Sequence, residues 1–244
     1  MSSKTLLTFV VVVLTAGSVW AGGADTIPAK GGDIEITPIT HGSVQLEYGG
    51  LAIYLDPWTR GDYSQAPMAD LILVTDIHGD HLDTEAIGKL SQEKTTLIVP
   101  AAAASQVEGE TVMDNGEKVE VAGVAIEAVP MYNLKRGPEE GGLFHVKGRG
   151  NGYILTLGGK RVYFAGDSAC TPDMKALKDI DVAFVPMNLP YTMPPAEAAA
   201  CVLAFAPKIV YPYHYRGSDL EEFTSALEDK PEIEVRIREW YPGS

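Results

Sequence analysis

The hexapeptide Asp76-Ile77-His78-Gly79-Asp80-His81 decides how this 244-residue sequence is interpreted. It directly follows an apolar run, residues 71–75, which is typical of a buried strand. Two imidazoles and two carboxylates within six residues, on a loop containing a glycine, can converge on one cation. Histidine together with aspartate suits Zn²⁺, Fe or Mn²⁺ better than Ca²⁺, which prefers oxygen ligands alone. The alternative is a polar turn in which Asp80 caps a helix and the histidines face solvent.

Two later apolar runs also end in residues of metal-binding type. Residues 163–165 lead through Gly166 to Asp167, and residues 209–213 lead to His214. Taken singly, Gly-Asp is a common turn and a lone histidine is more often structural. Strand ends at one edge of a sheet lie close together, however. The three runs together therefore predict a metal site at such an edge.

The remaining pattern indicates short strands mixed with peripheral helices. Residues 84–90 are predicted to form a helix capped by Asp83 or Thr84. The polar, glycine-rich stretch 131–149 is predicted to be a long loop, and such loops are often functional. Further strands are expected at residues 34–39, 43–48, 51–55, 71–74, 95–99, 118–121, 124–130, 152–157, 160–165, 182–186, 208–213 and 233–238, and further helices at 101–107, 172–178, 195–205 and 220–227. We predict one α/β domain of the α+β type, residues 22–244, built as an αββα sandwich of two mixed β-sheets flanked by helices.

Composition and charge restrict the class of partner. Hydrophobic residues make up 45% of the chain, which suits a globular domain with a sizeable core. Nineteen basic residues oppose 33 acidic ones, so the formal net charge is −14. Nucleic acids and anionic membrane surfaces attract basic proteins, so neither is an expected partner. A small-molecule substrate is expected instead, and the sequence leaves the oligomeric state open.

The N-terminal residues are predicted to be a signal peptide. Lys4 precedes an apolar run, residues 6–15, and the small-residue pattern before a cleavage site ends at Ala21. The apolar run is too short for a stable membrane-spanning helix, although an uncleaved anchor is the alternative. We therefore expect residues 1–21 to be removed, no stable membrane insertion afterwards, and a periplasmic or secreted protein. Cys170 and Cys201 could form one disulfide or remain separate buried thiols.

Several motifs of the chain together resemble the metallo-β-lactamase-fold hydrolases. Within that superfamily the chain is similar to a branch of metal-dependent hydrolases related to ascorbate-phosphate lactonases and phospholipid-cleaving enzymes. The Asp/His hexapeptide is the specific motif, and the others support it in combination. The motifs are His41-Gly42-Ser43, Leu55-Asp56-Pro57, the hexapeptide 76–81, Gly166-Asp167 and Pro212-Tyr213-His214.

The resemblance implies one complete metal site and one altered site. The complete set of ligands consists of Asp80, His81, Asp167 and His214. The family motif is His-x-His-x-Asp-His, but its first position is Asp76 here, and a family histidine in the later loop is replaced by Tyr132-Asn133. Asp76 and His78 could still hold a second, weaker metal together with Asp167, which would bridge the two ions. We therefore expect one or two divalent ions per chain, Zn²⁺ first, with Mn²⁺ or Fe²⁺ as alternatives.

The resemblance also suggests roles around the metal. Asp80 would be a ligand that orients the hydroxide, and His145 would act as a ligand or on the substrate unless it is a solvated loop residue. His41 would lie near the site or in a plain turn. Asp56 would accept a histidine N–H or only end a strand before Pro57. In the loop after the predicted strand 182–186, Tyr191 and Met193 could form the pocket wall or simply be packed.

The expected function is that of a metal-dependent hydrolase. A metal-bound hydroxide would attack a small ester, lactone, amide or phosphodiester, because a divalent metal lowers the pKa of bound water toward 7. The altered second site allows one alternative, a non-catalytic metal-binding or sensor protein on the same fold. A nuclease is disfavoured by the acidic charge.

Overall fold

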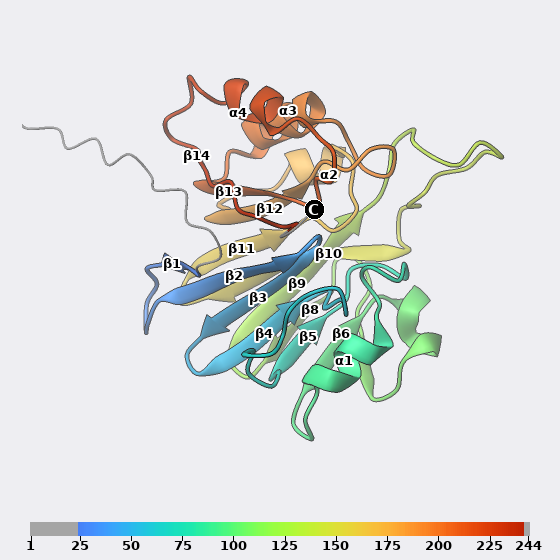
Figure 1. Ribbon diagram of the computed structural model, residues 1–244, viewed down its shortest axis with the longest axis vertical. Helices are drawn as coiled ribbons and strands as arrows, with labels where there is room; N and C mark the ends of the chain where they lie inside the picture. The colour runs from blue at the N-terminus through green and yellow to red at the C-terminus, as the bar shows by residue number, and fades with distance from the viewer. Residues whose placement is uncertain (1–23, 242–244) are drawn as a thin grey trace, which may run out of the picture.

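The computed structural model describes residues 24–241, which form two seven-stranded sheets packed face to face (Figure 1). The first sheet has the order β1-β2-β3-β4-β5-β6-β7, and the second has the order β14-β13-β12-β11-β10-β9-β8. In each sheet the first four strands along the chain pair antiparallel and the later strands pair parallel. The predicted α+β sandwich of two mixed sheets is therefore confirmed.

The elements have the following bounds. The first sheet contains β1 (Asp25–Ile27), β2 (Ile34–Thr40), β3 (Ser43–Tyr48), β4 (Leu51–Leu55), β5 (Leu71–Leu73), β6 (Thr96–Val99) and β7 (Glu110–Val112). The second contains β8 (Lys118–Val121), β9 (Val124–Met131), β10 (Gly150–Leu157), β11 (Lys160–Phe164), β12 (Val182–Pro186), β13 (Ile209–Tyr213) and β14 (Glu234–Val235). The helices are α1 (Thr84–Leu90), the 3₁₀ helix η1 (Ala101–Gln106), α2 (Pro172–Lys175), α3 (Pro195–Phe205) and α4 (Leu220–Ser225).

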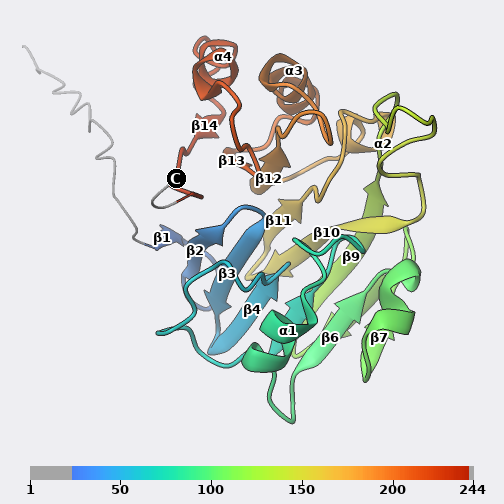
Figure 2. The same cartoon turned by 45° about the vertical axis from the view of Figure 1, so that its right-hand side comes forward.

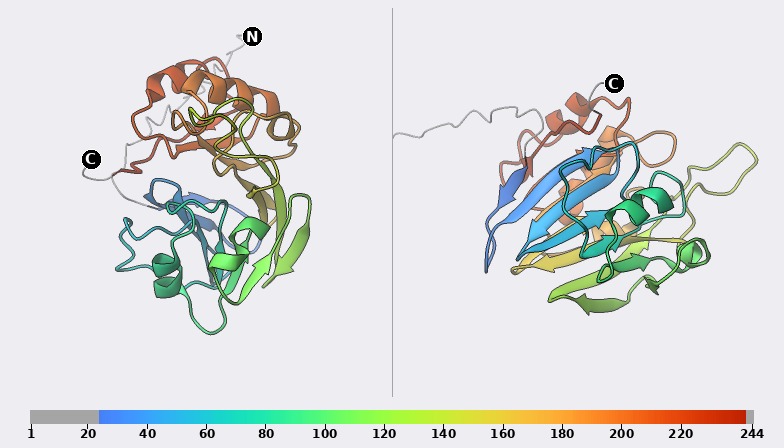
Figure 3. Two further views of the ribbon diagram at one scale, coloured as in Figure 1. Left: turned by 90° about the vertical axis from the view of Figure 1, so that its right-hand side faces the viewer. Right: turned by 60° about the horizontal axis from the view of Figure 1, so that its bottom comes forward.

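Three layers of apolar side chains hold the sandwich together. Between the sheets, side chains such as Leu46 and Ile53 of the first sheet belong to one buried cluster with Leu155 and Phe164 of the second. A second cluster joins the outer face of the second sheet to α2, α3 and α4, and a third joins the first sheet to α1 and η1. Figures 2 and 3 show these helices on opposite outer sides of the paired sheets.

The parallel strands bring the predicted motifs to one edge. The hexapeptide follows β5, Asp167 follows β11, and His214 follows β13. The strand β5 pairs parallel with β4 and β6, and β12 pairs parallel with β11 and β13, so the carboxyl ends of these strands and the loops after them lie on the same side of each sheet. The fold therefore collects residues that are far apart in the sequence.

Most sequence-predicted elements are present, with differences at the edges. The helix at 84–90 has the predicted bounds, and the Asp83 carboxylate accepts hydrogen bonds from the backbone of Glu85 and Ala86. Residues 101–106 form a 3₁₀ helix, α2 and α4 end earlier than expected, and the predicted strand 233–238 is reduced to two residues. The strands β1 and β7 were not predicted, because these three-residue edge strands are too short to carry a clear alternation.

Two other expectations concern the termini and the thiols. The predicted signal peptide, residues 1–21, lies outside the described residues. Among residues 24–241, no helix is long and apolar enough to cross a membrane. Cys170 and Cys201 are both buried free thiols, so of the two alternatives the structure has the separate thiols.

Candidate metal centre

All five histidines of the chain lie in one cluster at the carboxyl edge of the sheets. The possible metal-binding atoms fall into three groups, within each of which they lie no more than 4.8 Å apart. The groups are His81, Asp167 and His214; Asp76, His78 and His145; and His41, Asp80 and His214. Every sequence-predicted metal or catalytic candidate belongs to this cluster, which is mostly buried.

Strained backbone marks the strand ends that carry the cluster. His41, Asp56 and His214 have φ angles of 52°, 45° and 47°, values that residues other than glycine rarely adopt. Each directly follows β2, β4 or β13 and turns its side chain from the sheet into the cluster. Such conformations cost about 1–3 kcal/mol and tend to occur at functional sites.

Asp56 fixes the orientation of His81. Its buried carboxylate lies 2.8 Å from His81 Nδ1 and accepts hydrogen bonds from the Thr75 backbone N–H at 2.7 Å and the Thr75 hydroxyl at 2.6 Å. A carboxylate accepts only, so His81 Nδ1 carries a proton, and Nε2 is the atom that would give its lone pair to a cation once its own proton is released. The hydrogen bond that the sequence suggested for Asp56 is therefore present, and Asp56 is more than a turn residue.

Asp167 lies at the centre of the cluster. Its Oδ2 is 3.1 Å from His145 Nε2 and 3.4 Å from His81 Nε2, while its Oδ1 is 3.3 Å from His214 Nε2. These three nitrogens and Asp167 Oδ1 are buried, and despite the short distances none of them makes a contact with hydrogen-bond geometry among the described residues. Leaving one such atom unsatisfied costs about 1–3 kcal/mol. A divalent cation would satisfy all four, so the residues fit a metal.

The pKa values of Asp167, His81 and Asp80 also show that the cluster favours positive charge. Burial alone would raise the pKa of Asp167, but the nearby His214 and His81 hold it well below its usual value. Burial would lower the pKa of His81, but Asp167 and Asp56 raise it well above the usual value. For Asp80, contacts with His214 and His41 outweigh burial and keep the pKa well below normal. The carboxylates thus remain ionised and stabilise a cation between them.

His145 lies beside Asp76 and Asn133, the two positions that depart from the family motif. Its side chain is fully buried, so the expectation of a solvated loop residue is wrong. Asn133 Oδ1 lies 2.8 Å from His145 Nδ1 and accepts the His145 backbone N–H at 2.9 Å, which leaves Nε2 facing Asp76 at 3.7 Å and Asp167. Asn133 lies where the resemblance leads one to expect a histidine, and it orients His145 of the same loop.

Sequence reasoning missed Arg149, which holds Asp76. The guanidinium forms two hydrogen bonds with this carboxylate, Nε to Oδ1 at 3.1 Å and Nη2 to Oδ2 at 2.8 Å. His78 Nδ1 lies 2.9 Å from the same Oδ2. The guanidinium engages oxygens that a metal would also use, so this group of ligands is weakened. No pattern in the sequence pairs residues 73 positions apart.

Tyr241, near the end of the chain, was also missed. Its hydroxyl lies 2.7 Å from His41 Nδ1 and accepts the Arg216 backbone N–H at 3.0 Å. Burial lowers the pKa of His41 to about 4, so this imidazole is neutral near pH 7. Tyr241 then donates to Nδ1, and His41 Nε2–H points to Asp80 Oδ2 at 3.1 Å. His41 is buried in the site, so the plain-turn alternative is wrong.

A cavity of about 700 Å³ opens over the cluster. His41, His78, Asp80, Asp167 and His214 form its floor, and aromatic and apolar side chains form much of its wall. Tyr191 lines the cavity, as one sequence expectation had it, whereas Met193 is fully buried and is not among the lining residues. The cavity is large enough for a small organic molecule.

Comparisons with known proteins agree with this fold and cluster. A family model described as the Beta-lactamase superfamily domain matches residues 35–214. A UPF0173 metal-dependent hydrolase of Methanopyrus kandleri is 31% identical over 229 residues, covering 86% of this chain and 98% of that protein. A relative with the same description from Pyrococcus abyssi is 33% identical over 221 residues, covering 83% and 96%.

Solved structures show the same likeness. A Parabacteroides distasonis protein, described only as a metal-dependent hydrolase, has 43% sequence identity and a TM-score of 0.85, covering 90% of this chain and all of that one. A metallo-hydrolase from Ignicoccus hospitalis, at 23% identity and a TM-score of 0.71, shares the fold over 84% of this chain and 95% of its own. The chain belongs to the metallo-β-lactamase superfamily, in its metal-dependent hydrolase branch.

Proposed function

We propose that this protein hydrolyses a small ester, lactone, amide or phosphodiester by means of a divalent metal held in the histidine–aspartate cluster. The observation that carries the proposal is the set of four buried atoms on His81, His145, Asp167 and His214 that lack hydrogen-bond partners among the described residues. The cavity above them gives a substrate access to the cluster. Membership of the superfamily supports the reaction class.

Two ligand sets would hold the metal. Asp80, His81, Asp167 and His214 form the first set, and Asp76, His78 and His145 form the second, with Asp167 between them. We infer Zn²⁺ as the first candidate, because imidazole predominates, and Mn²⁺ or Fe²⁺ as alternatives. The metal, when bound, supplies a Lewis acid that makes hydroxide available from water near neutral pH.

The chain itself would position the reacting groups. Asp80 lines the cavity, and its Oδ2 lies 3.4 Å from His214 Nε2 besides the contact with His41. The low pKa of Asp80 keeps it ionised, so it would accept a hydrogen bond from the attacking water and orient it. His41, held by Tyr241, would keep Asp80 in that orientation.

The test is reversible loss of activity on metal removal. The protein is screened against a panel of esters, lactones, amides and phosphodiesters, then treated with a chelator and reloaded with Zn²⁺, Mn²⁺ or Fe²⁺. We expect hydrolysis of one class to disappear on chelation and to return with one of these metals. Activity that survives complete metal removal, confirmed by elemental analysis, would contradict the proposal.

A second candidate function is a metal-binding protein without catalysis. The observation that favours it is the double hydrogen bond between Arg149 and Asp76, which weakens one of the two ligand sets. In that case the protein would bind metal at the first set but hydrolyse none of the panel. Metal content and turnover measured on the same preparation separate the two functions.

We also propose that the protein is exported, to a periplasm or the outside. The order of Lys4, the apolar run and Ala21 supports this. Mass spectrometry of the protein from its native cell should then give Gly22 as the first residue. An intact Met1 on the folded protein would contradict it.

A further inference from the structure

The seven arginines of this chain differ in whether they pair with a carboxylate. Five of them lie within 4.0 Å of a carboxylate. The pairs are Arg136 with Glu197, Arg149 with Asp76, Arg161 with Glu127, Arg236 with Glu234 and Arg238 with Asp25. Arg60 and Arg216 have no such partner among residues 24–241, and both line the cavity over the histidine cluster.

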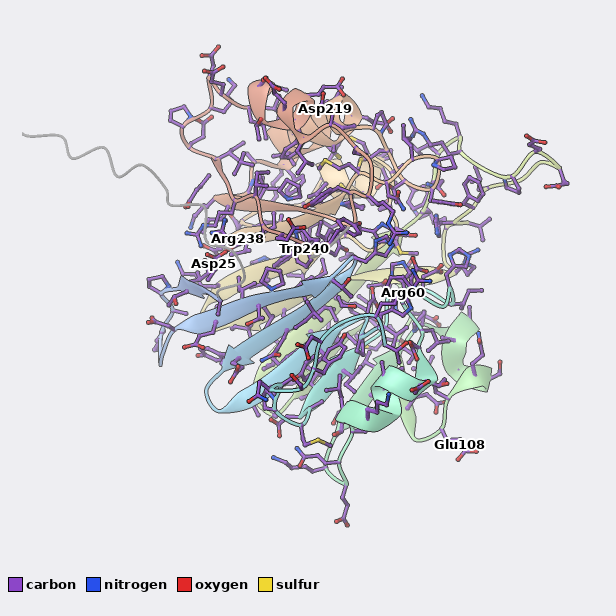
Figure 4. The ribbon with its side chains drawn as sticks, in the orientation of Figure 1. Asp25, Arg60, Glu108, Asp219, Arg238 and Trp240 are labelled. Carbon is purple, nitrogen blue, oxygen red and sulfur yellow. The ribbon has the colours of Figure 1, made fainter. Side chains whose placement is uncertain are left out.

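Aromatic rings, rather than carboxylates, support these two guanidinium groups. Arg60 Cζ lies 4.7 Å from the centre of the Trp58 ring, and Arg216 Cζ lies 5.4 Å from the centre of the Tyr241 ring. Figure 4 labels Arg60, which lies between α1 and β10 in that view. Stacking on a ring uses the face of the guanidinium and leaves its N–H edge available. That edge matches a carboxylate or phosphate with two parallel hydrogen bonds.

In a chain this acidic, arginines without a carboxylate partner are the exception. With a net charge of −14, cationic side chains have many acidic partners, and most arginines take one. Two cations that line one cavity without a carboxylate therefore create a local positive field in an acidic protein. The carboxylates in the cavity floor, Asp80 and Asp167, are already engaged by histidines.

The same cavity offers an apolar surface. Phe144 and Tyr191 contact each other edge to face at 5.1 Å between ring centres, and both line the cavity. Leu189, next to them in the lining, is 49% exposed. An apolar body could therefore lie against this wall while a charged end reaches the arginines.

We propose that Arg60 and Arg216 bind an anionic group of the substrate, such as a carboxylate or phosphate, at a distance from the bond that is hydrolysed. Phe144, Leu189 and Tyr191 hold its apolar body. The substrate class is thus a small organic anion with an apolar part. This inference rests on the proposed hydrolytic function and names the kind of substrate that the same site accepts.

The test compares two probes that share a naphthalene ring, by calorimetry on the metal-loaded protein. Naphthalene-1-sulfonate carries a negative charge but is a poor metal ligand, so it reports on the arginines, and 1-naphthalenemethanol is its neutral counterpart. At low ionic strength we expect the sulfonate to bind about tenfold more tightly, and this advantage to shrink as salt is added.

Variants assign the effect to the two residues. Arg60→Gln and Arg216→Gln should each weaken sulfonate binding about fivefold, and the double variant should remove the preference for the anion. Binding of the neutral probe should stay unchanged. Lys178→Gln removes the same charge from an exposed position outside the cavity lining and should change neither affinity. Thermal unfolding curves that overlay the wild type show that these surface variants are folded.

Two results would overturn the inference. Equal affinities for the two probes would do so, as would a sulfonate preference that persists in the double variant. Both are binding measurements, so they are independent of turnover. If no hydrolysis is found but the anion preference depends on both arginines, the anion site stands and the proposed reaction fails. If neutral substrates are hydrolysed and the double variant changes nothing, the reaction stands and the anion site fails.

Discussion

Among single residues, His81 is held on both sides of its ring. Its Nδ1 is hydrogen-bonded to the buried Asp56, and its Nε2 faces Asp167 without a hydrogen-bond partner in the described chain. Asp56 therefore selects the tautomer that can bind a metal. Its influence on the site is large although it does not face the cavity.

Replacing Asp56 by asparagine should weaken metal binding. In Asp56→Asn the side chain can no longer accept from both Thr75 and His81, so the proton on His81 Nδ1 loses its fixed acceptor. We expect metal affinity to fall about 10- to 100-fold, the range seen when such supporting partners are changed. Competition with a chromophoric chelator measures it.

Asp70→Asn is the matched control, because Asp70 accepts from the Ala52 backbone and pairs with Lys94 on the surface. It should leave the metal affinity unchanged. An Asp56→Asn variant that binds metal as tightly as the wild type would contradict the role of Asp56.

Removing the guanidinium at position 149 should act in the opposite direction. Metal titration of the wild type should give one tight equivalent and one much weaker. Arg149→Gln removes a positive charge beside Asp76 and frees carboxylate oxygens, so the weak equivalent should tighten about tenfold, which corresponds to about 1.4 kcal/mol. Calorimetric titration measures both equivalents. Two equally tight equivalents in the wild type would contradict the two unequal sets.

The sequence could predict the site residues that lie close together or at strand ends, but not their partners. The hexapeptide, Asp167 and His214 are recognisable because each follows an apolar strand. Arg149 and Tyr241 act through contacts across 73 and 200 positions of the chain. His145 could be considered from the loop, but its burial depends on how Asn133 folds that loop back.

At the scale of elements, the turn after β11 must bring Asp167 into the cluster. Gly166 has a φ of +58°, and a Cβ added to it would lie 2.6 Å from Met131 Sδ and 3.0 Å from Thr75 Cβ. The close approach of β9, β5 and this turn is therefore possible only with glycine.

Gly166→Ala should destabilise the protein strongly. A strained φ and an overpacked contact each cost about 1–3 kcal/mol, so we expect a loss of about 2–4 kcal/mol. Gly159→Ala is the matched control, because Gly159 also has a positive φ, of +81°, but nothing lies within 4 Å of an added Cβ. Urea unfolding of both variants gives the difference, and equal losses would contradict the packing argument.

Elements with strong local signals were predictable, among them the edge strand β8, whereas β1 and β7 and the length of β14 were not. The helix α1 has its predicted bounds because Asp83 caps it and its apolar residues face the sheet. Two of the three residues of β7 are exposed, and β14 has only two residues. Their pairing depends on the neighbouring strands and leaves little trace in the sequence.

At the scale of the whole molecule, the C-terminal segment fastens the two sheets to the site. Trp240 is fully buried in the inter-sheet cluster, and its carbonyl accepts the His41 backbone N–H at 3.0 Å. Next to it, Arg238 pairs with Asp25 of β1 at 2.6 Å, and Figure 4 shows these three side chains close together. Residues 238–240 thus lie beside β1 and the end of β2, which His41 follows.

Trp240→Ala should therefore cost stability as well as activity. Deleting a buried tryptophan side chain typically costs about 3–5 kcal/mol. Tyr241→Phe is the comparison variant, because it keeps the ring but loses the hydroxyl beside His41, and we expect about 1 kcal/mol for it. Chemical unfolding measures both. A Trp240→Ala variant within about 1 kcal/mol of the wild type would show that the segment is not part of the core.

The metal content of the purified protein tests the central claim most directly. Elemental analysis of the wild type, purified without chelators, should give at least one equivalent of a divalent transition metal per chain. Asp167→Ala removes the carboxylate at the centre of the cluster and should lower this content about tenfold or more, while the variant remains folded by circular dichroism. A wild-type protein without such a metal, even after incubation with Zn²⁺, Mn²⁺ or Fe²⁺, or an Asp167→Ala variant with the full wild-type content, would contradict the assignment.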